Sequence, residues 1–139
     1  MWYGTGENRH WWTWLGWAIP GAAGLLIVGF LWVSWQIGSD VRSTCDLAMR
    51  EHEGDRVTAL MSYVSSSSHS LRDRNRAVWT LGNLGDARAL PLLEKYRTRK
   101  PCDHERTLCQ REVEKAIQLC RGGVNLPAMV WRRAYTSHK

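Results

Sequence analysis

The sequence lacks the local motifs that identify several classes of enzyme. Its 139 residues contain no nucleophile elbow, no phosphate-binding glycine loop and no metalloprotease helix motif. Proline is rare, with 4 residues, and no runs of β-branched residues occur after residue 39. Apolar residues there recur instead at intervals of three and four, which favours helices over strands. We therefore predict an all-α protein without enzymatic activity.

Charge is absent from residues 11–39. This run of 29 residues exceeds the roughly 20 apolar residues that cross the hydrocarbon core of a bilayer. We therefore predict one transmembrane helix at 11–39, preceded by a short polar tail at 1–10. Tryptophan favours the membrane interface. The predicted membrane-interface residues lie near both ends of the run: Trp11, Trp12, Trp14, Trp17, Trp32 and Trp35.

Signal peptides and buried core helices are also apolar. A signal peptide is usually shorter and ends in a small-x-small cleavage pattern, which does not follow this run. A soluble chain of this size has too little other apolar surface to enclose a helix of this length. We therefore expect the segment to remain in the protein as a single-pass membrane anchor.

Proline 20 lies inside the apolar run. Because proline removes one backbone hydrogen bond and bends a helix, two geometries stay open. Either one kinked helix covers 11–37, or an interfacial segment at 11–19 precedes a span that begins at Pro20. Small residues let membrane helices approach one another closely. The small-residue patch that we predict to make helix–helix contact consists of Ala18, Gly21, Ala22 and Gly24.

One helical domain is predicted at residues 40–121. After residue 39 there are 18 lysines and arginines and 12 acids, which accounts for the chain's whole formal charge of +6. A segment of about 100 residues buries one modest core. Five helices are expected, over 41–51, 56–64, 71–83, 87–96 and 104–120. Ser70 and Asp73 form the predicted capping box of the third helix.

The helices form a repeat with a period of about 31 residues. The segment GDRVTAL at 54–60 aligns with GDARAL at 85–90 after one gap. Residues 76–93, RAVWTLGNLGDARALPLL, resemble a bacterial HEAT-like repeat of the phycobilisome-lyase type. In that family a helix ending in Leu-Gly, a Gly-Asp turn and a helix opening with an Ala-Leu-Pro-like run follow one another. The resemblance implies a short HEAT-like α-solenoid behind the membrane anchor.

A scaffold function follows from this resemblance. HEAT-like arrays present a helical face to other proteins, so we expect a membrane-anchored protein–protein interaction scaffold, an accessory or assembly subunit of a membrane complex. The expected partners are proteins in or at the membrane and the lipid bilayer itself. A few relatives attach bilin chromophores, so a tetrapyrrole carrier or bilin-lyase-like protein is the alternative.

A cysteine- and histidine-rich segment suggests that the protein could carry a metal ion. Its candidate ligands are Cys102, His104, Cys109 and Cys120. Structural zinc sites usually use pairs of ligands two to four residues apart, and only the first two residues here meet that spacing. Cys109 and Cys120 are separated by roughly 16 Å along one helix, so they can share neither a metal ion nor a disulfide. We therefore predict no cofactor and no metal site in this segment.

Disulfides are the other chemistry open to the four cysteines. With Cys45 included, the pairs are Cys102 with Cys109 and Cys45 with Cys120, or Cys102 with Cys120 and Cys45 with Cys109. Buried free thiols in a helical core are the alternative. Disulfides persist only outside the cytosol. The presence of four cysteines in this domain therefore favours an extracytoplasmic location, on a bacterial inner membrane. Basic residues near the span favour the cytosolic side instead: Arg9 precedes it, and Arg42, Arg50 and Arg56 follow it. The side therefore stays undecided, with a lean to the outside.

Other polar groups have simpler interpretations. His52 lies between Glu51 and Glu53, and an exposed, charged helix end before the next glycine accounts for all three residues. A basic stretch at 72–76 alternates around a helix and has no interleaved aromatic residues, so nucleic acid is not a predicted partner.

The C-terminal segment at 122–139 is basic. It is predicted to be either a cap on the open end of the helical array or a tail whose Trp131 enters the lipid interface. Of these we favour the cap.

Overall fold

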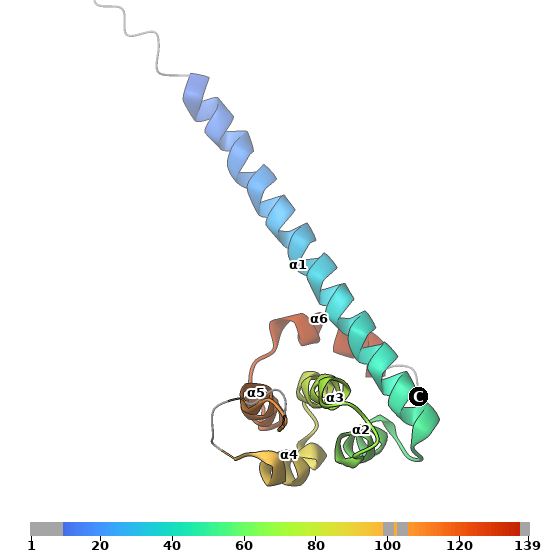
Figure 1. Ribbon diagram of the computed structural model, residues 1–139. Coiled ribbons are helices and arrows are strands. Elements are labelled where there is room, and N and C mark those ends of the chain that lie inside the picture. Colours follow the sequence, from blue (N-terminus) through green and yellow to red (C-terminus); the bar gives the residue numbers. More distant parts are fainter. Residues whose placement is uncertain (1–9, 99–101, 103–105, 137–139) are drawn as a thin grey trace, which may run out of the picture.

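The computed structural model describes the backbone of residues 10–98, 102 and 106–136, and the side chains of these residues except 10–18, 133, 134 and 136. Over this part of the chain the protein has six α-helices, one 3-10 turn and no strand, which confirms the predicted all-α class there. One long helix projects with its N-terminal part from a group of shorter helices (Figure 1).

The long helix, α1 (His10–Glu51), has 42 residues and no break. The prediction of a separate helix over 41–51 is therefore wrong. The composition changes sharply at Asp40, but backbone hydrogen bonding does not depend on composition, and the hydroxyl groups near this point bond within the helix. Ser34 donates to the Phe30 carbonyl at 2.7 Å, for example, and Thr44 to the Asp40 carbonyl at 2.9 Å.

The helix also continues on both sides of Pro20. Of the two geometries that the sequence left open, the structure has the one in which residues 11–19 and the following residues form a single helix. After α1 the chain turns at Gly54, whose φ of 114° lies in a region that favours glycine.

Local capping residues start the helices of the repeat. These elements are α2 (Arg56–Ser65), α3 (Leu71–Leu84), the 3-10 turn η1 (Ala87–Ala89) and α4 (Leu90–Tyr96). Asp55 caps α2 by accepting the N–H of Thr58 at 3.1 Å. Ser70 accepts the N–H of Asp73 at 3.2 Å, and its hydroxyl donates to the Asp73 carboxylate at 2.6 Å, so the predicted cap of α3 is confirmed. Gly85 then ends α3 with a left-handed φ of 66°.

The last two helices, α5 (Gln110–Cys120) and α6 (Leu126–Thr136), differ from the prediction. α5 begins later than the predicted range of 104–120, because the extended backbone of Cys109 precedes it and its N–H donates to the Asn75 side chain at 2.8 Å. The segment that was predicted to be a cap or a tail forms a helix. Asn125 starts it by accepting the N–H of Ala128 at 3.2 Å.

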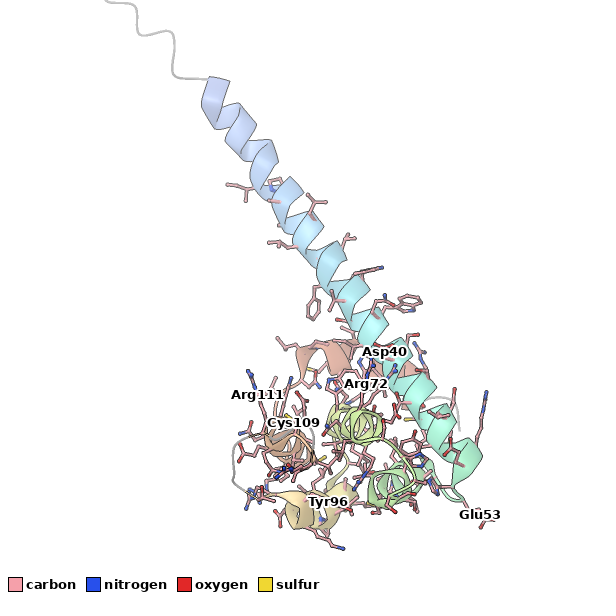
Figure 2. The ribbon with its side chains drawn as sticks, in the orientation of Figure 1. Asp40, Glu53, Arg72, Tyr96, Cys109 and Arg111 are labelled. Atoms are coloured by element: carbon pink, nitrogen blue, oxygen red, sulfur yellow. The ribbon has the colours of Figure 1, made fainter. Side chains whose placement is uncertain are left out.

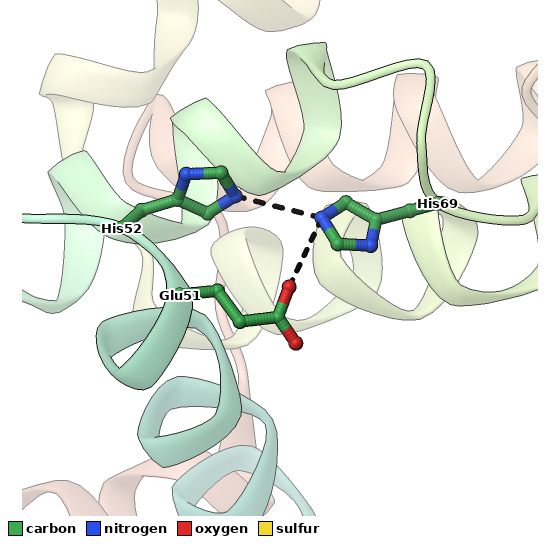
Figure 3. Close-up of side chains that lie close together, drawn as sticks. All are labelled: Glu51, His52 and His69. Atoms are coloured by element: carbon green, nitrogen blue, oxygen red, sulfur yellow. Dashed lines mark hydrogen bonds and ion pairs between the residues drawn. The ribbon is translucent and has the colours of Figure 1, made fainter.

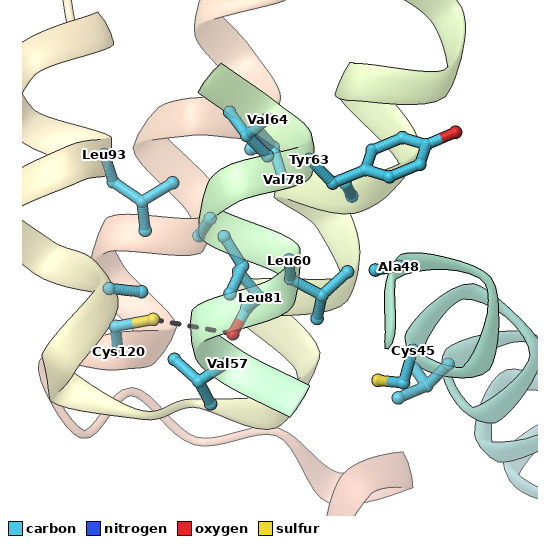
Figure 4. Close-up of a cluster of buried hydrophobic side chains, with 14 of the residues drawn as sticks. Cys45, Ala48, Val57, Leu60, Tyr63, Val64, Val78, Leu81, Leu93 and Cys120 are labelled. Atoms are coloured by element: carbon cyan, nitrogen blue, oxygen red, sulfur yellow. Dashed lines mark hydrogen bonds between the residues drawn. The ribbon is translucent and has the colours of Figure 1, made fainter. Parts of the chain in front are cut away.

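A single core joins the C-terminal part of α1 to the other helices. α1 packs against α2, α3 and α6, while α5 packs against α3 and α4. Figure 4 shows side chains from the middle of this core. Its fully enclosed aliphatic residues are Val41, Leu60, Val64, Val78, Leu81, Leu93 and Val113.

α1 and α6 approach each other closely at Gly38. A Cβ atom there would lie 2.8 Å from Cγ of Trp131, so only glycine lets the indole ring lie against the helix. α6 thus runs from the end of α5 back to α1 (Figure 1). The last helix of the domain thereby contacts the first.

Candidate functional site

The N-terminal part of α1 presents an apolar surface that no other part of the described chain covers. The helix is long and apolar enough to cross a membrane, and it is the single such helix among the residues described. Figure 2 shows its side chains projecting into open space. The large exposed ones are Ile19, Leu25, Leu26, Ile27, Val28, Phe30, Leu31, Trp32, Val33 and Trp35.

The predicted membrane-interface tryptophans are only partly described. Trp32 and Trp35 are exposed, at the end of the apolar surface nearest the helical domain. The side chains of the other four, Trp11, Trp12, Trp14 and Trp17, lie outside the described residues.

Gly21, Ala22 and Gly24 of the small-residue patch are not covered by any other residue that the structure describes. A Cβ atom added at Gly21 or Gly24 would meet nothing within 4 Å, and Ala22 is exposed. The side chain of Ala18 lies outside the described residues. The three described residues of the patch are therefore accessible to a second helix, and helix–helix contact there stays a prediction.

A groove of about 430 Å³ opens between α1, α2 and α3. Its apolar wall includes Leu47, which is 44% exposed. Acidic and basic side chains face each other across it: Asp46 and Arg50 come from α1, and Asp73 and Arg76 come from α3. An ion pair of 3.5 Å between Asp40 and Arg76 joins the two helices. The groove thus offers charges of both signs around an apolar strip.

The structure brings two of the four cysteines together. The Sγ atoms of Cys102 and Cys109 are 3.0 Å apart. The thiol of Cys109 lowers the pKa of Cys102, whereas burial raises the pKa of Cys109. Cys102 is exposed, so this pair combines an accessible thiol with a covered one. Such a pair needs little movement to form a disulfide between Cys102 and Cys109, which is one of the predicted pairs.

The other two cysteines are separate core residues. Cys120 donates to the Leu81 carbonyl with a distance of 3.6 Å, and burial raises its pKa to about 11. Cys45 is fully enclosed on α1, and Figure 4 shows the two thiols on different sides of the core. His104 lies outside the described residues. The structure therefore does not assemble Cys109 and Cys120 into a common ligand set.

Three polar side chains converge in the structure (Figure 3). Two of them are adjacent in the sequence, but no sequence pattern links them to the third. Glu51 and His52 lie at the C-terminal end of α1, and His69 lies in the loop before α3. The Nε2 atom of His69 is 3.3 Å from Oε2 of Glu51 and 3.5 Å from Nε2 of His52. Glu51 and Glu53 are exposed at the end of α1, as interpreted, whereas His52 is half-buried.

Tyr63 connects this cluster to the groove. Its ring stacks on that of His69, with ring centres 3.6 Å apart and planes 7° from parallel, and the same residue lines the groove. Burial raises the pKa of Tyr63, so its hydroxyl stays neutral at physiological pH. No local sequence pattern links residues 52, 63 and 69, because their contact depends on how α1, α2 and the following loop pack.

Comparison with known families identifies one repeat unit. Residues 73–96 match the family model of the PBS lyase HEAT-like repeat. The match covers most of α3, the Gly-Asp turn, η1 and α4, which is a pair of helices joined by a short turn. No curated protein and no solved structure matches the chain significantly. The chain thus contains a HEAT-like repeat, as the resemblance at 76–93 predicted, and such repeats suggest a helical scaffold for protein interaction.

Proposed function

We propose that this protein is a single-pass membrane protein whose helical domain docks on protein partners beside the membrane, as an accessory or assembly subunit of a membrane complex. The proposal rests on the difference between the two parts of α1. Its outer part is apolar and exposed, while Val41, Cys45 and Ala48 of the same helix are enclosed in the core of the HEAT-like domain. A span within residues 11–39 and a domain that packs against the same helix from about Ser34 onward would then share one continuous helix.

The length of the exposed part of α1 matches the thickness of a bilayer. Residues 10–33 form a helix of about 36 Å at 1.5 Å per residue, and the hydrocarbon core of a bilayer is about 30 Å thick. Ser34 is fully enclosed, so the domain begins to cover the helix just beyond this length.

The position of α6 also supports a domain that rests on the membrane surface. This helix lies on the side of the domain from which the outer part of α1 projects (Figure 1). Its apolar side chains Leu126, Met129 and Val130 are exposed, as is the preceding Val124. Buried apolar area strengthens the binding of a helix in the interface, so these four residues would contribute to contact with lipid.

The groove between α1 and α3 is the proposed docking face. HEAT-like repeats bind proteins through surfaces formed by successive helices. Here the apolar strip around Leu47 supplies contact area, and the charged pairs on either side of it supply orientation. We propose no catalytic role, because a shared fold does not by itself carry the lyase activity in the family's name.

Anchoring can be tested with charges placed in the span. Arginine near the middle of a spanning helix costs about 2.5 to 3.5 kcal/mol, so the double variant Leu26→Arg and Val28→Arg should release the protein from membranes washed with alkaline carbonate. The control is Gln118→Arg, an exposed position on α5, which should stay with the membrane. Release of the unaltered protein under the same wash would contradict an integral anchor.

Docking can be tested with a photo-crosslinking amino acid at Leu47, in the cell that produces the protein. We expect one discrete crosslinked protein from this position. The control position, Glu114, is exposed on α5 and does not line the groove, and it should give no such product. Equal crosslinking from both positions, or none from Leu47, would refute the groove as the docking face. Because this result does not depend on the carbonate wash, anchoring and docking can fail separately.

A further inference from the structure

The contacts of His69 are poorly explained by hydrogen bonding alone. Its Nε2 atom lies 3.3 Å from the Glu51 carboxylate and 3.5 Å from Nε2 of His52. The first distance is longer than the usual range of about 2.7 to 3.2 Å for an N–H···O bond, and the second separates two ring nitrogens by still more. One ring nitrogen also carries at most one hydrogen, which can be directed at only one of the two neighbours.

The same distances suit ligands that share a metal ion. Zinc is bound at about 2.0 to 2.2 Å by imidazole nitrogen and carboxylate oxygen, so ligand atoms at the corners of a regular tetrahedron lie about 3.3 to 3.6 Å apart. The two measured distances fall in this range. All three ligand atoms lie within 4.8 Å of one another. The side chain of Glu51 is 42% exposed, so it has room to adjust the remaining separation.

We propose that Glu51, His52 and His69 bind one Zn²⁺ ion. Two imidazoles and a carboxylate form a ligand set that zinc accepts in proteins, whereas Ca²⁺ and Mg²⁺ prefer oxygen ligands throughout. Three protein ligands would leave a fourth position for water or for a donor group of a partner. This site is separate from the cysteine segment that the sequence had suggested for metal, and it does not depend on the proposed docking function.

The surrounding structure holds two of the ligands in place. The Tyr63 ring stacks on His69, and Ser70, the next residue, caps α3. The N–H of His52 donates to the Ala48 carbonyl at 2.9 Å, which keeps its backbone in the last turn of α1. A site whose ligands are already oriented loses less conformational entropy when the ion binds.

A metal ion here would join two parts of the domain. It would attach the end of α1 to the loop that precedes α3, and Tyr63 carries the contact onward to the groove. Zinc should therefore raise the midpoint of thermal unfolding, since a ligand that binds the folded state stabilises it. It should also restrict movement at one end of the groove.

The test is a zinc titration of the full chain, purified in detergent without a polyhistidine tag, stripped with a chelator and measured against a chromogenic zinc indicator. We expect one equivalent to bind and the unfolding midpoint to rise. His69→Ala and His52→Ala should each weaken binding by at least about 100-fold, because even outer-shell changes cost 10- to 100-fold. Glu51→Gln should weaken it as well, and Glu53→Gln is the matched control that should not.

Cobalt identifies the ligands independently. Co²⁺ bound by nitrogen and oxygen should show only weak visible bands, whereas thiolate ligation adds an intense near-ultraviolet band. The double variant Cys102→Ser and Cys109→Ser should leave both zinc affinity and the cobalt spectrum unchanged.

Three results would overturn the proposal: no stoichiometric zinc binding by the unaltered chain, retention of full affinity in the two histidine variants, or loss of binding in the cysteine variant. The last would assign the ion to the thiols. The two histidine variants remove different ligands, so a folding defect in one, detected by circular dichroism, leaves the other variant and the zinc-dependent unfolding of the unaltered chain as tests.

Discussion

Trp131→Ala should be among the most destabilising single substitutions outside the central core. Trp131 on α6 is 5% exposed, lies against Gly38 of α1 and meets the ring of Tyr135 edge-on, with ring centres 6.2 Å apart. Truncating a buried tryptophan to alanine costs about 3 to 5 kcal/mol. The indole N–H finds no hydrogen-bond partner among the described residues, and leaving a donor buried and unpaired costs about 1 to 3 kcal/mol. Because the variant removes that penalty, we expect a net loss of about 2 to 3 kcal/mol.

For a domain of this size, that loss corresponds to a decrease in the unfolding midpoint of roughly 10 to 20 °C. The assay is thermal unfolding of the full chain in detergent micelles, followed by far-ultraviolet circular dichroism, in which the apolar part of α1 stays helical and the signal change reports the domain. Trp131→Phe is the matched control. It keeps an aromatic ring and also removes the unpaired N–H, so we expect it to lose less than half as much.

Two outcomes would refute this account of α6. An unchanged midpoint for Trp131→Ala would mean that α6 does not contribute to the core and that the C-terminal segment behaves as a tail. An equal loss in both variants would mean that the indole N–H has a stabilising partner, contrary to the structure.

Three further predictions follow from particular contacts. Asp55→Asn keeps the helix cap but removes the charge that pairs with Arg88 at 2.7 Å; both groups are about half exposed, so the loss should be below about 1 kcal/mol at pH 7. Hydrogen bonds from Thr58 and Arg88 lower the pKa of Asp55 to about 2, so this contribution is full above pH 4, and in acid titrations the difference between variant and wild type should vanish as the pH falls from 4 towards 2. Gly82→Ala should cost about 1 to 3 kcal/mol in the same thermal assay, because its Cβ would lie 2.8 Å from a backbone atom of α5. Iodoacetamide should modify Cys102 of the reduced native protein first and Cys120 only after unfolding, as peptide mass spectrometry would reveal, and equal rates would contradict the burial of Cys120.

The starts and ends of the repeat helices were predictable because short-range chemistry determines them. The Ser70 cap was predicted, Asp55 and Gly85 lie in the Gly-Asp turns of the predicted repeat, and α2 and α3 end within one residue of the predicted ranges. A capping side chain bonds to a backbone group two or three residues away, so no knowledge of packing is needed.

The misses have two different causes. For α6 a local signal was present, since Asn125 followed by Pro127 is a suitable start for a helix, but residues 122–139 were interpreted only as a cap or a tail. For α1 the change in composition at Asp40 was interpreted as a boundary between two elements. Composition reflects the surroundings of a helix, whereas the continuity of its backbone depends on the absence of breakers.

The histidine cluster could not have been predicted from one sequence. Glu51 and His69 are far apart in the chain, and their contact requires α2 to fold back along α1. The cysteine segment gave the opposite result: its residues are close in sequence, yet Cys120 faces α3 and Cys102 contacts Cys109. Proximity along the chain therefore indicated the contact of Cys102 with Cys109 but neither the separation of Cys120 from them nor the contact of His69 with Glu51.

One ion-pair network gives the repeat of about 31 residues a physical meaning. Arg88, in the second Gly-Asp turn, donates to Asp86 of its own turn at 2.8 Å and to Asp55 of the first turn at 2.7 Å. The two turns are therefore aligned side by side, which places α2 beside α3 and leaves α1 as the outer member of the array. Leu47 of the groove and Glu51 of the histidine cluster lie on the same continuous helix as the proposed membrane span. Under the proposed function, a tilt or rotation of the span would therefore move the groove and the histidine cluster together.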